Sequence, residues 1–192
     1  MQPGRPATAS FQFCYASRFF SMPIIPRRLP PALVLAACTA LAQAQCPPAQ
    51  PDRYRIQGAQ VADRATGLEW QRCSMGTTVT ASGQCQGVPA LLSLPDAGKA
   101  AASAGQGWRL PTAQELLTLV TAPGCPAPTL DAAVFPGLAD LGDGIPYWSD
   151  TPADLPVPMR MHYYVDFADG RVDAHTLGFP LAVRLVRGGA GQ

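Results

Sequence analysis

The sequence is poor in charge and has almost no histidine. Charged residues make up 14% of the 192 residues, hydrophobic residues make up 47%, and the two histidines are His162 and His175. A nucleic-acid-binding domain needs a clustered basic face, and a formal net charge of +1 indicates none. We therefore expect no nucleic-acid partner. The length and composition are typical of one globular domain with some processing sequence.

Motifs for metal binding and catalysis are also missing. No Cys-x-x-Cys pair is present, which argues against a zinc site. Ser149, Asp166 and Asp173 lie near the histidines in the sequence, but the chain has no Gly-x-Ser-x-Gly elbow to carry a nucleophile. We therefore expect no catalytic residue, no cofactor and no bound metal.

One group of acidic residues leaves calcium open as an alternative. The group lies around a proline-rich stretch and consists of Asp140, Asp143, Asp150 and Asp154. Calcium prefers carboxylate and carbonyl oxygens, but no Asp-x-Asp-x-Asp-Gly loop is present. A solvated acidic loop is the interpretation that we favour.

The first 44 residues contain no acidic side chain and predict a secretory signal. Arg27 and Arg28 form the positive segment, residues 33–41 form the apolar segment, and Ala42-Gln43-Ala44 forms a small-x-small cleavage site. The apolar run is about ten residues long, whereas spanning a bilayer takes roughly 20. We expect residues 22–44 to be a signal peptide that is cleaved after Ala44.

Two further expectations concern this leader. Met22 lies where such a signal would start, so we expect residues 1–21 to be upstream sequence wrongly assigned to the protein. The alternative cleavage is at Leu35-Ala36-Ala37-Cys38, which has the spacing of a bacterial lipoprotein box and would anchor the chain to a membrane through a lipid on Cys38. Cleavage after Ala44 predicts a periplasmic or secreted protein.

Four cysteines follow the predicted cleavage site: Cys46, Cys73, Cys85 and Cys125. In an oxidising compartment, an even number of cysteines in a small domain predicts disulfides, and four allow three connectivities. Cys73 and Cys85 flank a polar segment that packing alone cannot hold, and closing such a loop contributes about 3 kcal/mol on the chain-entropy model. We favour Cys73–Cys85 with Cys46–Cys125, and leave free thiols and a catalytic thiol as alternatives.

Local signals predict short strands and two helices after a proline-rich lead-in over residues 45–53. We expect strands at 54–56, 60–62 and 67–71, with a turn at 63–67, because Asp, Thr and Gly supply local hydrogen bonds and positive φ. Ser93-x-x-Asp96 begins a helix over 97–104. Thr112-x-x-Glu115 begins a helix over 116–120, and this spacing predicts a capping box, which makes Glu115 a capping residue.

The C-terminal half predicts a sheet. We expect strands at 147–149, 163–167, 171–174 and 181–187, with Asp169-Gly170 as a hairpin turn. Prolines 152, 156 and 158 predict that residues 151–161 form a long loop that joins no sheet, because proline cannot donate to a ladder. Loops of this length in a compact domain are usually functional.

An ordered set of motifs resembles a known family. The matching strings are Ala62 to Cys73 (ADRATGLEWQRC), Gly107 to Leu116 (GWRLPTAQEL), Tyr147 to Ser149 (YWS), Tyr164 to Val172 (YVDFADGRV) and Val183 to Gly188 (VRLVRG). In this order they are similar to the Lcl C-terminal domain family, a domain of unknown function in secreted bacterial proteins. The resemblance covers about residues 54–189.

The resemblance implies a fold and a type of function. Part of its central motif also occurs in sulfatase-modifying domains of C-type-lectin-like fold, so it implies an α+β fold with a twisted antiparallel sheet, two flanking helices, long irregular loops and disulfide staples. Formylglycine-type oxidation needs cysteines near the C-terminus, and none follows Cys125. The founding member is an adhesin domain that binds sulfated glycosaminoglycans, so by analogy the chain is a surface binder. The ten basic and 13 acidic residues after Ala44 do not favour a strongly basic site.

We therefore expect a non-catalytic secreted or envelope binding or adhesion module with a glycan or protein ligand. The expected binding surface lies at the end of the proline-rich loop and consists of Arg160, Met161, His162, Tyr163 and Tyr164. Loops carry recognition residues, and tyrosine and arginine are frequent at interfaces. The alternatives are a structural envelope subunit without a ligand site and a hydrolase or oxidase on the same scaffold.

Overall fold

A computed structural model describes residues 50, 52–121 and 125–188 of the chain. The predicted upstream segment, the signal peptide, Cys38 and Cys46 lie outside the described residues, as does most of the lead-in. None of the helices in the described part is long and apolar enough to cross a membrane.

The first sheet has four antiparallel strands in the order β1-β2-β3-β11. They are β1 (Tyr54–Gln57), β2 (Gln60–Asp63), β3 (Leu68–Gln71) and β11 (Val186–Gly188). The predicted turn between β2 and β3 is confirmed: the Ala65 amide donates to Asp63 Oδ1 at 3.0 Å, and Gly67 has a φ of +71°. Leu68 and Trp70 are buried on one face of β3, as the alternation predicts.

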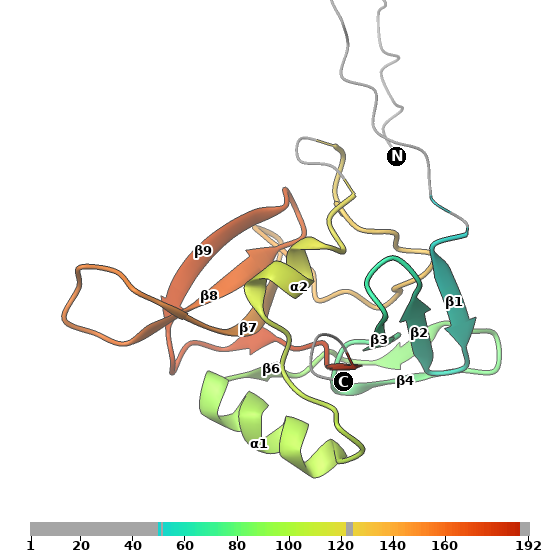
Figure 1. Ribbon diagram of the computed structural model, residues 1–192, viewed down its shortest axis with the longest axis horizontal. Coiled ribbons are helices and arrows are strands. Elements are labelled where there is room, and N and C mark those ends of the chain that lie inside the picture. Colours follow the sequence, from blue (N-terminus) through green and yellow to red (C-terminus); the bar gives the residue numbers. More distant parts are fainter. Residues whose placement is uncertain (1–49, 51, 122–124, 189–192) are drawn as a thin grey trace, which may run out of the picture. The chain divides into compact units, whose positions relative to one another are not determined.

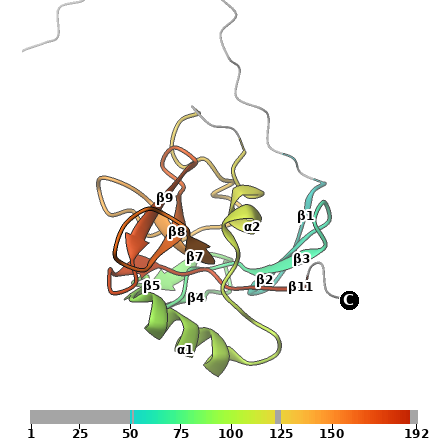
Figure 2. The same cartoon turned by 60° about the vertical axis from the view of Figure 1, so that its left-hand side comes forward.

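The second sheet has five strands in the order β6-β10-β7-β8-β9. They are β6 (Leu91–Leu92), β7 (Pro146–Ala153), β8 (Met161–Asp166), β9 (Arg171–Thr176) and β10 (Leu181–Ala182). All neighbours are antiparallel except β10 and β7, which pair in parallel at Ala182 and Tyr147. Figures 1 and 2 show β7 to β9 as a twisted ribbon on one side of the molecule, with β1 to β3 on the other.

Both predicted helices form, and their caps explain where they begin. Helix α1 (Leu94–Ala104) starts at Ser93, whose side chain accepts from the Asp96 amide, and stops at Gly105. Helix α2 (Ala113–Leu117) starts with the predicted capping box: Thr112 Oγ1 accepts from the Glu115 amide at 3.1 Å and Glu115 accepts from the Thr112 amide at 2.8 Å. The helix lies three residues earlier than the predicted range of 116–120 and ends at Leu117.

The segment between the first two paired cysteines is more ordered than the sequence predicts. Cys73 and Cys85 form the predicted disulfide, with their Cα atoms 5.7 Å apart. The polar segment that they enclose forms a hairpin of β4 (Thr77–Val79) and β5 (Cys85–Gly87) and not a plain loop. Cys125 is disulfide-bonded too, and its predicted partner, Cys46, lies outside the described residues.

The expected loop over residues 151–161 is wrong in its bounds. Strand β7 runs to Ala153, and Pro152 pairs with His162 of β8, so the loop is confined to residues 154–160. Strand β10 pairs with β7 only at Tyr147, so β7 is an edge strand at Pro152, where a missing amide hydrogen breaks no ladder. The register shifts between Trp148 and Pro152, which is where the strand accommodates the proline.

The expected single strand over residues 181–187 is also wrong. The chain forms β10 in the second sheet, crosses through residues 183–185, and forms β11 in the first sheet. Residues 181–186 are all buried, so the run resembles one interior strand in sequence although it serves two sheets.

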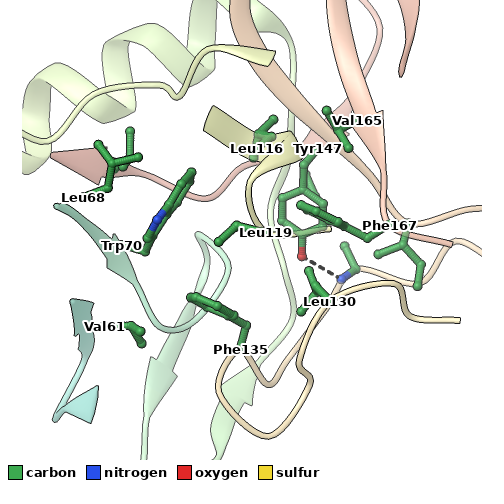
Figure 3. Close-up of a cluster of buried hydrophobic side chains, with 14 residues drawn as sticks. Val61, Leu68, Trp70, Leu116, Leu119, Leu130, Phe135, Tyr147, Val165 and Phe167 are labelled. Atoms are coloured by element: carbon green, nitrogen blue, oxygen red, sulfur yellow. Dashed lines mark hydrogen bonds between the residues drawn. The ribbon is translucent and has the colours of Figure 1, made fainter. Parts of the chain in front are cut away.

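The main core lies between the two sheets and is covered by α2 (Figure 3). Trp70 from β3, Leu116 from α2 and Val165 from β8 are all completely buried in it. The Tyr147 hydroxyl accepts from the Ala139 amide at 3.1 Å and so ties an irregular segment to the sheet. A second core packs α1 against Trp148 and Leu181. Mostly antiparallel sheets, two short helices and a disulfide make this an α+β fold.

Candidate functional site

A cleft of about 480 Å³ opens between β2, β3 and the β4 hairpin. We call it the Trp108 cleft. It is lined by Ala59, Gln60, Gln71, Cys73, Ser74, Met75, Gly76, Thr77, Thr78, Val79 and Trp108. The lining contains amides, hydroxyls, one indole and no charged side chain, so the cleft presents hydrogen-bonding groups beside an apolar wall.

The floor of the Trp108 cleft is held by backbone hydrogen bonds to the C-terminal segment. The Gln71 amide donates to Leu185 O at 3.0 Å and the Met75 amide to Val183 O at 2.9 Å. Gly76 has a φ of +88°, and a Cβ there would lie 2.6 Å from the Ala90 amide nitrogen, so a side chain at this position would displace the segment between β5 and β6. The shape of the cleft is therefore fixed by the fold.

A completely buried arginine lies behind this floor. Arg184 Nη1 donates to Gln71 O at 2.8 Å and to Arg72 O, and Nη2 donates to Ser74 Oγ at 3.3 Å. No carboxylate pairs with it in the described part of the chain, and desolvation lowers the pKa of its guanidinium. Sequence reasoning missed this residue, although a lone charge inside an apolar run was a signal for it.

Two of the polar side chains that line the cleft make no hydrogen bond to the rest of the described chain. Within the described residues the Gln71 amide and the Thr78 hydroxyl have no intramolecular hydrogen bond, whereas Gln60 Oε1 accepts from Arg187 at 3.4 Å. Arg187 lies 4.6 Å from the Trp108 ring centroid and pairs with Glu69 at 2.9 Å. The indole is thus held in place while the Gln71 amide and Thr78 hydroxyl face the cleft with free hydrogen-bonding capacity.

A second concave surface crosses β8 and β9, and we call it the β8–β9 groove. It comprises two adjoining cavities of about 240 Å³ each, which share Asp143, Tyr164 and Asp166. One cavity is mainly apolar, with Phe179 and Leu141 among its walls, and the other is mainly acidic. The groove shares no lining residue with the Trp108 cleft.

The structure separates the five residues of the predicted binding surface. Arg160 is exposed at the end of the 154–160 loop, and the four others lie on β8, where alternation puts Met161 and Tyr163 on one face and His162 and Tyr164 on the other. Tyr164 lines the β8–β9 groove. A binding role for all five residues stays a prediction.

The serine considered for nucleophilic chemistry is held by the fold, and the two histidines lie on β8 and β9. Ser149 is completely buried, and its hydroxyl donates to Tyr163 O at 2.6 Å. Burial lowers the pKa of His162, and His175 Nδ1 accepts from the Thr176 amide at 2.9 Å. Ser149 is therefore unavailable as a nucleophile.

The aspartates considered for calcium are spread over the surface. In the part of the chain that the structure describes, no three His, Cys, Asp or Glu side chains are grouped so as to hold a metal ion. Asp140 instead accepts from the Gly142 amide at 2.8 Å, which stabilises a turn.

Comparison with known proteins identifies one family. A family model described as the Lcl C-terminal domain matches residues 59–187, which include the strands β2 to β11 and both helices apart from one terminal residue. No curated protein and no solved structure matches the chain significantly.

Proposed function

The chain belongs to the Lcl C-terminal domain family, and from this premise we propose that it is an exported, non-catalytic binding module that holds a glycan in the Trp108 cleft. The observation that carries the proposal is the lining of that cleft. Uncommitted amide and hydroxyl groups stand beside an indole in a cavity without charged side chains.

The chemistry of a sugar matches this lining. A pyranose ring has an apolar C–H face and a rim of hydroxyls that both donate and accept hydrogen bonds. An amide such as that of Gln71 can donate and accept at once, and a tryptophan offers an apolar surface with little entropy to lose. Sites of this kind are concave, largely preformed and lined by a few placed polar groups.

Export is supported by the disulfide bonding of the cysteines in the described part of the chain. Cys73, Cys85 and Cys125 are all disulfide-bonded, and disulfides persist in oxidising compartments. With the predicted signal over residues 22–44, this favours a periplasmic or secreted protein. Anchoring through Cys38 is the alternative.

We also propose that the fold is C-type-lectin-like. Its support is the mostly antiparallel sheets with two short helices, together with the irregular segment over residues 125–145 that precedes β7. Folds of that type bind their ligands through irregular segments. The hairpin and turn residues that line the Trp108 cleft belong to segments of this kind.

The test is a glycan array probed with the full chain, exported and purified with its disulfides intact. Binding to neutral glycans is expected, and Gln71→Leu should weaken it about tenfold because the apolar side chain leaves sugar hydroxyls unpaired. Gln114→Leu, an exposed amide on α2, is the matched control and should bind like the wild type. Equal binding by all three proteins, or no glycan binding at all, would contradict the proposal and favour a protein ligand or a structural subunit.

A further inference from the structure

The β8–β9 groove has an apolar wall that is partly exposed. Phe179 and Leu141 are 42% and 39% exposed, and both border the cavity that also contains Tyr164. The Phe179 ring is stacked on His175, with the ring centroids 3.6 Å apart and the planes 25° from parallel. This exposed aromatic pair is preorganised, since each ring holds the other.

The acidic rim of the groove is also held in position. Asp166 Oδ1 accepts from the Ile145 amide at 2.7 Å and from the Ala168 amide at 2.8 Å. Its other carboxylate oxygen lies where a Cβ at residue 144 would stand, so the groove requires Gly144. Two backbone donors therefore keep this carboxylate oriented without a bound partner.

The groove carries an excess of negative charge. Four aspartates line it, namely Asp143, Asp166, Asp169 and Asp173, against one cation, Arg171. Arg171 pairs with Asp169, so three carboxylates have no cationic partner within the described residues. The Tyr164 phenol lies among them, and its pKa is raised by burial and then by the charges of Asp173, Asp166 and Asp169.

The distribution of these carboxylates suits an organic cation better than a metal ion. They surround the groove and do not converge, and no three acidic, His or Cys side chains of the described chain form a metal-binding group. Lysine and arginine combine an aliphatic stem with a charged head, so the stem can lie on an apolar wall while the head meets carboxylates. The π-face of an aromatic ring attracts the same head.

We infer that the β8–β9 groove docks a lysine- or arginine-bearing segment of a partner protein. The aliphatic stem of the basic residue lies against Leu141 and Phe179, and its charged head lies among Asp143, Asp166 and Asp173. This site is separate from the Trp108 cleft, so the two ligands bind independently.

The test is calorimetric titration of the full, disulfide-intact chain with an acetylated and amidated Lys-Gly-Lys-Gly-Lys peptide. The matching Glu-Gly-Glu-Gly-Glu peptide and calcium chloride alone serve as comparison ligands. The lysine peptide should bind, and Asp143→Asn and Asp173→Asn should each weaken it about threefold to fivefold, because each removes one exposed carboxylate from the rim. Phe179→Ala should weaken it too, by removing the apolar wall.

Asp154→Asn is the matched control, since it removes the same charge from an exposed loop position outside the groove. Its affinity should equal that of the wild type, and Gln71→Leu in the Trp108 cleft should also leave it unchanged. Equal weakening by Asp154→Asn would show unspecific charge attraction and overturn the assignment. Binding of the glutamate peptide, binding of calcium in place of the lysine peptide, or no binding of the lysine peptide would overturn it as well.

Discussion

Asp63 shows how one residue serves both a turn and a buried ion pair. Its carboxylate is completely buried and accepts from Arg53 Nε at 3.0 Å and from Arg53 Nη2 at 2.7 Å. Arg53 Nη2 also donates to Thr118 O at 2.6 Å, which links the first sheet to the end of α2. The sequence predicts the turn at Asp63, because an Asx turn is local. It could not predict the ion pair, because Arg53 reaches Asp63 only across paired strands.

This pair makes stability depend on pH in a defined direction. Burial alone would raise the pKa of Asp63, but the hydrogen bonds from Arg53 and from the Ala65 amide outweigh it and lower the pKa below the ordinary 3.8. The stabilisation is therefore complete above about pH 4 and is lost as the pH falls through the lower folded-state pKa. Glu115 adds a contribution of the same sign, since Arg109 and the Thr112 amide lower its pKa against burial.

Asp63→Asn should lower the free energy of unfolding at pH 7 by about 2 to 4 kcal/mol, because it leaves the mostly buried Arg53 without its counter-charge. It should also flatten the loss of stability between pH 5 and pH 2 by removing one titrating group, leaving the part due to Glu115. Urea unfolding at several pH values measures both effects, with Asp52→Asn, an exposed neighbour, as the control. A variant that loses stability in acid as steeply as the wild type would refute this account.

The elements that could be predicted from the sequence are those that depend on interactions between residues close together in the chain. The capping box of α2, the Ser93 cap of α1 and the β2–β3 turn were predicted because each depends on residues within four positions. Strands β4, β5 and β6 were not predicted because they have only two or three residues each, and the partner of β6 is the distant strand β10.

The candidate sites were harder to predict for the same reason. Lining residues of the Trp108 cleft come from three separated stretches, and its support comes from Arg184, which lies 113 positions after Gln71. Of the predicted binding surface, Tyr164 lines the β8–β9 groove, whereas strand alternation puts Met161 and Tyr163 on the opposite face of β8.

The β4–β5 hairpin depends on its disulfide, since two strands of three residues cannot stand alone. Replacing both Cys73 and Cys85 by serine should lower the free energy of unfolding by about 3 kcal/mol, as expected for a loop of this length. It should also weaken glycan binding, because Cys73 and β4 form part of the Trp108 cleft.

Urea unfolding and the glycan array test the two effects together. Val88→Ser is the control, because Val88 adjoins β5 and is 82% exposed. Unchanged stability in the double-serine variant would contradict a stabilising role of the disulfide. Unchanged glycan binding would exclude the hairpin from the binding site.

At the scale of the whole domain, the segment Leu181–Gly188 joins the two sheets, because it contributes β10 to one and β11 to the other. Arg184 lies at the crossing, with its charged group on carbonyls of Gln71 and Arg72 and between the rings of Phe135 and Tyr147. Disruption of this residue should therefore affect both sheets together.

Arg184→Lys should lower the free energy of unfolding by about 2 to 3 kcal/mol while unfolding remains a single transition. An ammonium keeps the charge but cannot span the acceptors that the planar guanidinium reaches, so buried carbonyls are left unpaired. Differential scanning calorimetry measures both the shift and the number of transitions, with the exposed Arg160→Lys as control. Two separate transitions, or an unchanged melting temperature, would show that Arg184 does not couple the sheets.

Strand β9 is the outermost strand of its sheet, and such an edge normally invites other chains to add to it and aggregate. Here two of its backbone donors are already occupied: the Ala174 amide donates to Asp173 Oδ1 at 2.7 Å, and the Thr176 amide donates to His175 Nδ1 at 2.9 Å. A strand from a partly folded second copy could not pair with these two amides. It would also lie beside the negative charge of Asp173. The same side chains that border the groove thus help to keep concentrated, newly folded copies from polymerising edge to edge.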